Sequence, residues 1–474
     1  MNKISIIVSG GVSLCTYEVG VLTSLYQLFL EKGDIDFEVV GGSSAGAIST
    51  FLFSSSMFKG FNPYFMAGMI INNTDIKNLV SKKDEFVLDF DNLIPSFEKI
   101  FKCESCCEYS YGDNICKKVR SINFCKDKVC SKKKSDNIKM VFNVTTLEPI
   151  LKDIEESVFS EKFTLRTHNI SFVLDFKSCS TKKIYKILKA SASFPIFFPP
   201  VRYTFQSGDL KVFSHFYDDE NLELNLTDGG VTQNLPLKII FNNINESERI
   251  VLIIPHPDDP LTIIENSRKK RRSNLIDSII KLLDSSFYQS YYSDLKLSFE
   301  FNRIEKRFFD IRNSLKSSFK NLDLEEKKVV EKFLNGCSLD LENIDESLST
   351  GKKIIRIDMV SPQKPSEELA GEILNHFGGF FDRSLRYNDF LVGYFDGLKY
   401  CKGLGYDLEP LFSRSDLNRE MGNVNFKKIK NKKIIFILIL KCILSFLYPY
   451  RKNFLITFLI LFLKTTLNLL EKFY

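Results

Sequence analysis

Residues 37–53 read FEVVGGSSAGAISTFLF, and this stretch decides the fold. Phe37–Val40 is an apolar run typical of a buried strand, and Ala47–Phe53 has the composition of an apolar helix. Gly41–Gly46 joins them through a turn sharp enough to need glycine, which carries no Cβ atom. A strand that enters a helix in this way predicts an α/β fold.

The alternation of strands and helices extends through the first 260 residues. Leu14–Leu30 places its apolar residues on one helical face and is followed by Gly33. Continuous apolar strands between helices predict a mostly parallel central sheet with both faces covered. The other strand-like runs are Ile4–Val8, Val141–Val144, Ile170–Phe176 and Ile250–Ile254.

The composition excludes several classes of protein. Hydrophobic residues make up 44% of the 474 residues and charged residues 26%, which is ordinary for a globular chain and excludes a disordered or collagen-like one. The net charge of +6 is small for this length. It gives no reason to expect a nucleic acid partner.

Ser44 is the candidate nucleophile, because Gly42, Ser44 and Gly46 fit the pattern G-x-S-x-G between a strand and a helix. A serine needs a base, and none of the four histidines lies in a catalytic motif, so we interpret all of them as structural. Asp228 precedes two glycines at the end of a strand-like run and is the alternative base. A simple Asp-Gly turn is the other interpretation. The histidines are His168, His215, His256 and His376.

Gly10, Gly11 and Val12 lie between the first strand and the first helix. Glycines there let backbone N–H groups approach a ligand oxygen, as an oxyanion hole requires. A phosphate-binding turn is the alternative, but the G-x-G-x-x-G and P-loop patterns are missing.

Together these motifs resemble the patatin-like phospholipase family over roughly residues 1–260. The matching segments are SGGVSL (9–14), GGSSAGA (41–47), ASASFPIFFPP (190–200) and DGGVTQNLP (228–236). The resemblance implies a patatin-like three-layer sandwich and a Ser44–Asp228 dyad that cleaves carboxylic esters. It implies an oxyanion hole of Gly10, Gly11 and Val12 amides, no cofactor and no metal. The implied substrate is a membrane phospholipid or another acyl-ester lipid, and a non-catalytic membrane scaffold with the same fold is the alternative.

Two features lie outside the common family pattern. Ser13 stands where most relatives have a basic residue. Residues 369–396 are similar to the helical C-terminal region of one bacterial-type subgroup, and we expect Arg386, Asp389 and Asp396 to form ion pairs on a helix surface.

Six of the eleven cysteines crowd into residues 103–130. Zinc binding by Cys103-x-x-Cys106 with Cys125 and Cys130 is one interpretation, and free thiols or disulfides are the others; we predict no metal. The N-terminus lacks the pattern of a signal peptide, so we expect a reducing compartment.

We expect three parts along the chain. Residues 1–260 form the catalytic domain, with a less regular, Cys-rich insertion or cap at 55–139. Residues 261–430 are mainly helical, with one short strand within 352–360 and a basic loop at 268–272. Residues 431–474 form a membrane-associating tail.

Five lysines at 427–433 precede the apolar run Ile434–Leu447, which covers only about 21 Å as a helix, less than a ~30 Å bilayer core. A hairpin or interfacial helices therefore fit best, with one span over Phe454–Leu470 or a buried helical hairpin as alternatives. We expect membrane association with the catalytic domain facing the cytoplasm.

Overall fold

The computed structural model describes residues 2–32, 34–61, 63–81, 88–90, 135, 137–155, 162–195, 197–206, 222–245, 247, 249–255, 275–336, 355–362, 369, 377–413 and 463. Several sequence predictions lie outside these residues. They are the cysteine cluster 103–130, the basic run 268–272, His215, His256 and His376, and the tail from residue 427 apart from residue 463.

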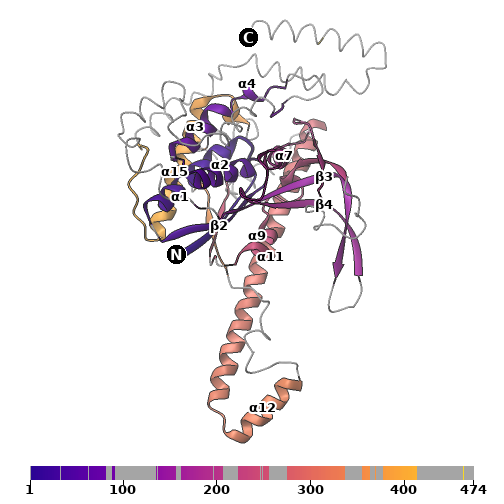
Figure 1. Ribbon diagram of the computed structural model, residues 1–474, viewed down its shortest axis with the longest axis vertical. Helices are drawn as coiled ribbons and strands as arrows, with labels where there is room; N and C mark the ends of the chain where they lie inside the picture. Colours follow the sequence, from indigo (N-terminus) through magenta and orange to yellow (C-terminus); the bar gives the residue numbers. More distant parts are fainter. Residues whose placement is uncertain are drawn as a thin grey trace, which may run out of the picture.

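A mostly parallel sheet forms the centre of the molecule, which confirms the predicted α/β class (Figure 1). Five strands pair in parallel, in the order β3 (Lys139–Glu155), β2 (Ile35–Gly42), β1 (Asn2–Val8), β7 (Arg249–Ile253) and β8 (Arg356–Val360). Three further strands are antiparallel: β4 (Lys162–Leu174) and β6 (Glu223–Asp228) on β3, and β5 (Val201–Thr204) on β6.

Helices cover both faces of this sheet. Ile6 and Val8 of β1 belong to the larger core cluster, and Ile7 belongs to the second cluster on the opposite face, because side chains alternate along a strand. The larger core packs against α1 (Cys15–Glu31), α2 (Ala45–Lys59), α3 (Pro63–Asn73), α7 (Thr181–Ser191) and α15 (Arg383–Gly403). The second core packs against α9 (Leu237–Asn243) and α11 (Leu275–Lys320).

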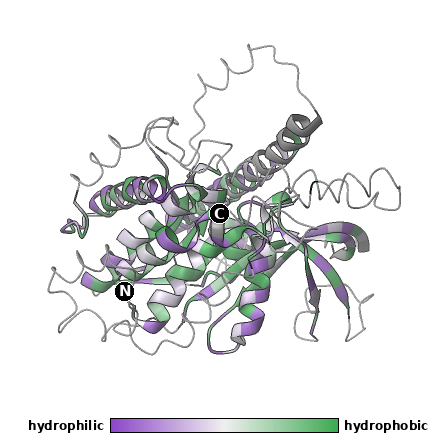
Figure 2. Ribbon diagram, turned by 90° about the horizontal axis from the view of Figure 1, so that it is seen from above, coloured by the Kyte–Doolittle hydropathy of each residue, from purple (hydrophilic) through white to green (hydrophobic). Residues whose placement is uncertain are grey.

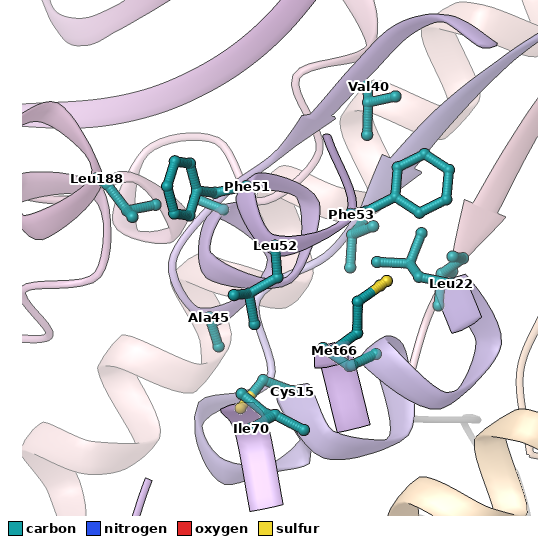
Figure 3. Close-up of a cluster of buried hydrophobic side chains, with 14 of the residues drawn as sticks. Cys15, Leu22, Val40, Ala45, Phe51, Leu52, Phe53, Met66, Ile70 and Leu188 are labelled. Atoms are coloured by element: carbon teal, nitrogen blue, oxygen red, sulfur yellow. The ribbon is translucent and has the colours of Figure 1, made fainter. Parts of the chain in front are cut away.

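The larger core is the more aromatic of the two and lies under the candidate site. Figure 3 shows Leu22 of α1, Phe53 of α2, Met66 of α3 and Val40 of β2, all of which belong to this cluster. In Figure 2 the elements at the centre of the body are coloured mostly as hydrophobic. The remaining elements are η1 (Val12–Leu14), α4 (Ile76–Leu79), η5 (Gly229–Val231), α12 (Leu324–Gly336) and η7 (Gly378–Phe380).

Residues 55–79 differ from the irregular insertion that we expected. They form the end of α2, then α3 and α4, and Phe61, Phe65 and Ile71 are buried in the larger core. Their apolar side chains gain more from packing on α1 than an open cap could provide, since burying one such residue stabilises by about 1.5–3 kcal/mol.

The chain after residue 260 packs into the same body. The helical content and the strand within 352–360 are confirmed, and β8 extends the sheet beside β7. Helix α15 lies so close to α1 that a Cβ atom on Gly393 would overlap Tyr17 O. Helix α11 continues for about 69 Å, at 1.5 Å per residue, and Figure 1 shows it leaving the body with α12 at its far end.

The expected surface ion pairs on α15 are wrong. Arg386 and Asp389 are buried, and Asp396 accepts a hydrogen bond from Tyr17 on α1 (3.0 Å). Packing against α1 and α3 thus buries Arg386 and Asp389 and partly buries Asp396. Among the described residues, no helix is both long and apolar enough to cross a membrane.

Candidate active site

Ser44 occupies the turn between β2 and α2 in a strained conformation. Its φ of 56° and ψ of −129° are unusual for a residue with a side chain, and Val12 is the other non-glycine residue of the described chain with positive φ. A Cβ atom on Gly42 would lie 2.6 Å from Gly46 C, and one on Gly46 would lie 2.5 Å from Val8 O. Both flanking glycines are therefore required by close backbone contacts, as the sequence pattern predicts.

The structure brings Asp228 directly to Ser44 from 184 residues away. The Ser44 hydroxyl donates to Asp228 Oδ2 at 2.5 Å, and Gly230 N donates to Oδ1 at 2.8 Å. Asp228 ends β6 and has no exposed surface. This burial raises its pKa to about 7, although the hydrogen bonds from Ser44 and Gly230 act in the opposite direction. At neutral pH such a carboxyl can both accept and return a proton.

The end of α7 supports both side chains. Ser191 Oγ accepts a hydrogen bond from Ser44 N at 3.2 Å, and Ser193 O accepts from Asp228 N at 3.0 Å and from Thr227 Oγ1 at 2.7 Å. The distance between Ser44 and Asp228 thus depends on Ser191 and Ser193, which lie in the segment 190–200 that was matched by sequence.

The glycine loop lies against the serine, but one of its predicted donors has another partner. A Cβ atom on Gly10 would lie 2.9 Å from Ser44 Cβ. Gly10 N donates to Asn234 Oδ1 at 2.7 Å, and this corrects the prediction that its amide faces a substrate oxygen. An N–H group has one hydrogen, so the hydrogen bond to Asn234 occupies the amide of Gly10. The same bond fixes the glycine loop. Gly11 and Val12 remain as candidate donors.

Helix α11 holds the loop after Asp228 from the opposite side. Ser290 Oγ donates to Thr232 O and accepts from Asn234 N, both at 3.1 Å. Gln233 Nε2 donates to Asp294 at 3.3 Å, and burial raises the pKa of Asp294 to about 7. Sequence analysis did not identify these residues, because serine and aspartate on a long polar helix carry no distinguishing pattern.

An apolar pocket begins at Ser44. Its walls include Ile48 and Leu52 of α2, Met69 and Ile70 of α3, and the rings of Phe377 and Phe380. Figure 3 shows Cys15, Ala45, Leu52 and Ile70 close together at this place. A pocket with apolar walls beside a nucleophile suits a hydrocarbon chain better than a polar substrate.

A second buried carboxyl, that of Glu18, lies between α1 and α2. Ser49 Oγ on α2 donates to Glu18 Oε2 on α1 at 2.6 Å, and Glu18 Oε1 has no hydrogen-bond partner among the described residues. Burial raises the pKa of Glu18 to about 8, although the hydrogen bond from Ser49 lowers it. Glu18 is therefore mostly neutral at pH 7 and joins α1 to α2 without a buried charge.

The remaining titratable candidates have structural partners. His168 Nδ1 lies 2.8 Å from Thr146 O, which agrees with our structural interpretation of that histidine. In the part of the chain that is described, no three His, Cys, Asp or Glu side chains gather in a way that could hold a metal ion.

A serine on a sharp turn from a strand to a helix, as at Ser44, is typical of serine hydrolases with an α/β fold. Residues 6–95 match the family model of patatin-like phospholipases, so the resemblance stated from the motifs is confirmed for this segment. The matched segment contains Gly10–Val12 and Ser44 and ends before Asp228. It supports a lipid hydrolase activity in general.

The other comparisons add little. Among solved structures, the chain is similar to VipD from Legionella pneumophila, with 11% identity over 92% of this chain and 75% of that one. The TM-score of 0.33 is too low to support an argument about fold or function. No curated protein sequence matches the chain.

Proposed function

We propose that this protein is a lipid acyl hydrolase that cleaves carboxylic ester bonds with a Ser44–Asp228 dyad. The observation that carries the proposal is the 2.5 Å hydrogen bond between the two side chains. The alternative, a non-catalytic scaffold, gives no reason for a buried carboxylate whose best hydrogen bond is to a strained serine.

The mechanism follows from the positions of these groups. Ser44 Oγ attacks the ester carbonyl carbon while its proton passes to Asp228 Oδ2. The carbonyl oxygen becomes negative and is stabilised by the amides of Gly11 and Val12 at the start of the first helical turn. The C–O bond to the alcohol then breaks, and the alcohol leaves with the proton from Asp228. The acyl group stays on Ser44.

Water completes the cycle at the same dyad. Asp228 takes a proton from water, the resulting hydroxide attacks the acyl carbon, and Ser44 leaves as an alcohol by recovering that proton. The acyl chain occupies the apolar pocket from Ile48 to Ile70 throughout. The product is a free carboxylic acid.

The first test uses the full chain with phosphatidylcholine vesicles and p-nitrophenyl butyrate. We expect acid release and covalent labelling by a fluorophosphonate. Ser44→Ala should abolish both and Asp228→Asn should lower turnover by at least about 10³-fold, since dyad members act as a unit. Ser54→Ala removes another buried hydroxyl of α2 and should leave labelling unchanged. Hydrolysis that survives in Ser44→Ala would refute the proposal.

The proposed substrate is a lipid presented at a membrane, and we propose that the enzyme associates with that membrane with its catalytic domain facing the cytoplasm. The support is the sequence of the tail, in which five lysines precede long apolar runs. A hydrolase held at the interface meets its insoluble substrate at high local concentration.

A further inference from the structure

The turn η7 lies against the glycine loop although it is 366 residues away in the chain. Gly379 N donates to Ser13 Oγ at 3.0 Å, and both residues are buried. A Cβ atom on Gly379 would lie 2.9 Å from that same Oγ atom. The same Cβ atom would lie 3.0 Å from Ser13 Cβ and 3.3 Å from Ser13 O, so this close contact favours glycine at residue 379.

Arg386 fixes the other side of the turn. Its side chain is 2% exposed, and Nη1 donates to Gly379 O at 2.8 Å and to Phe380 O at 3.3 Å. The Nε atom donates to Ile71 O of α3 at 2.7 Å, and Asp75 supplies a compensating charge 3.2 Å from Nη2. One guanidinium group therefore ties the turn to the helix that forms the opposite wall of the pocket.

The same turn forms part of the pocket wall. Phe377 and Phe380 line it together with Ser44, and their ring centroids are 5.9 Å apart. Phe377 also packs on Phe197 at 5.0 Å, in the segment that follows the support for Asp228. The turn is thus in contact with the loop, the pocket and the support of the dyad.

Val12 explains why the loop needs such a partner. Its φ of 53° is costly for a β-branched residue, by about 1–3 kcal/mol, and persists only where the surroundings fix it. Ser13 is the next residue and is held by Gly379. Ser13 therefore supplies the loop with a neutral hydroxyl that has a backbone partner.

We propose that the turn Phe377–Phe380 is part of the catalytic centre and that Ser13, Gly379 and Arg386 are positioning residues. Gly379 holds the oxyanion loop through Ser13, and Phe380 sets which acyl chains the pocket accepts. This inference rests on the proposed acyl hydrolase function.

The effect of Phe380 on which acyl chains the pocket accepts is tested by comparing Phe380→Leu with its neighbour Phe381→Leu in the full chain. The two rings are 7% and 8% exposed, but only Phe380 lines the pocket, so the pair is matched in burial. We expect Phe380→Leu to lower the ratio of kcat/KM for p-nitrophenyl laurate to that for p-nitrophenyl butyrate by about fivefold, the scale of one or two lost methylene contacts. Phe381→Leu should keep the wild-type ratio.

The contact between Ser13 and Gly379 is tested by comparing Ser13→Ala with Ser54→Ala. Both changes remove a buried serine hydroxyl, but Ser54 Oγ has no partner among the described residues. We expect Ser13→Ala to lower kcat about tenfold for both esters with KM changed less than about twofold, since a shifted oxyanion donor costs less than the ~10²–10³ of a lost one. Ser54→Ala should keep the wild-type kcat, even if both variants lose thermal stability.

The outcomes separate the two proposals. Wild-type protein that neither hydrolyses the esters nor labels at Ser44 overturns the proposed function and this inference with it. Active wild-type protein whose ester ratio is the same in Phe380→Leu and Phe381→Leu, and whose kcat is the same in Ser13→Ala and Ser54→Ala, overturns the inference alone.

Discussion

At the residue scale, burial determines what each acidic side chain can do. Asp228, Glu18 and Asp294 all lie in surroundings that favour their neutral forms, and the pKa of each is raised to between about 7 and 8. Asp228 alone among them bonds to a strained serine. In the proposed mechanism we therefore expect the protonation of Asp228 to control reactivity, and we expect the protonation of Glu18 to affect stability.

The pH profile of hydrolysis should report the protonation of Asp228. A base must be ionised before it can accept the Ser44 proton, so kcat/KM should rise about tenfold per pH unit below pH 7 and level off above it. The measurement is the initial rate with p-nitrophenyl butyrate between about pH 5 and pH 9, at each pH where the protein stays folded. A flat profile across pH 7 would contradict the role of Asp228 as base.

Glu18→Gln should change how stability depends on pH. The folded pKa of Glu18 is about 8, whereas the ordinary pKa of a glutamate is about 4.5, so the folded state binds the proton more tightly. Its contribution to stability is fully present below about pH 4.5 and is lost as the pH rises toward about 8. Urea unfolding should show the wild-type free energy of unfolding falling relative to that of Glu18→Gln by up to about 1.4 kcal/mol per pH unit. Parallel pH curves for the two proteins would refute the burial argument.

At the scale of elements, α11 acts on the site through the loop 231–234. Ser290→Ala removes a donor to Thr232 O and leaves Asn234 N without its acceptor, so stability should fall by about 1–3 kcal/mol. Because Asn234 holds Gly10, kcat should fall severalfold as well. Ser318→Ala, at an exposed position of the same helix, is the control and should leave kcat and the unfolding midpoint unchanged. Equal kcat values for the two variants would show that α11 does not position the loop.

The elements themselves were predictable, and most of their tertiary partners were not. Apolar runs gave β1, β2 and β7 and the helix α1, because burial on both faces leaves a local signature. The pairing of Ser44 with Asp228 was predicted from the family resemblance and not from the spacing of the two motifs. The partner of Gly10 lies 224 residues away at Asn234, and a charged residue such as Arg386 is expected at a surface until its carbonyl partners are known. Such non-local pairs leave no periodic pattern in a single sequence.

At the scale of the whole molecule, the C-terminal region is part of the body that carries the site. Strand β8 extends the sheet, α15 lies along α1, and η7 reaches the glycine loop. The boundary that we placed near residue 260 therefore marks a change of sequence pattern within one packed structure. The pocket is therefore lined both by residues of the N-terminal part, such as Val12, and by Phe377 and Phe380 of the C-terminal region.

Membrane binding of the whole protein should depend on the lysines at 427–433. Replacing all five with glutamine removes about 1 kcal/mol of attraction per lysine near an anionic surface, so co-sedimentation with phosphatidylserine-containing vesicles should fall sharply.

The matched control replaces the five basic residues at 268–272, which changes the net charge equally. Hydrolysis of soluble p-nitrophenyl butyrate should stay at the wild-type rate in both variants, since neither run contains a residue of the proposed dyad or oxyanion loop. If both variants lose vesicle binding equally, attraction follows net charge and the tail has no special role. If only the tail variant detaches, the tail holds the enzyme at its substrate.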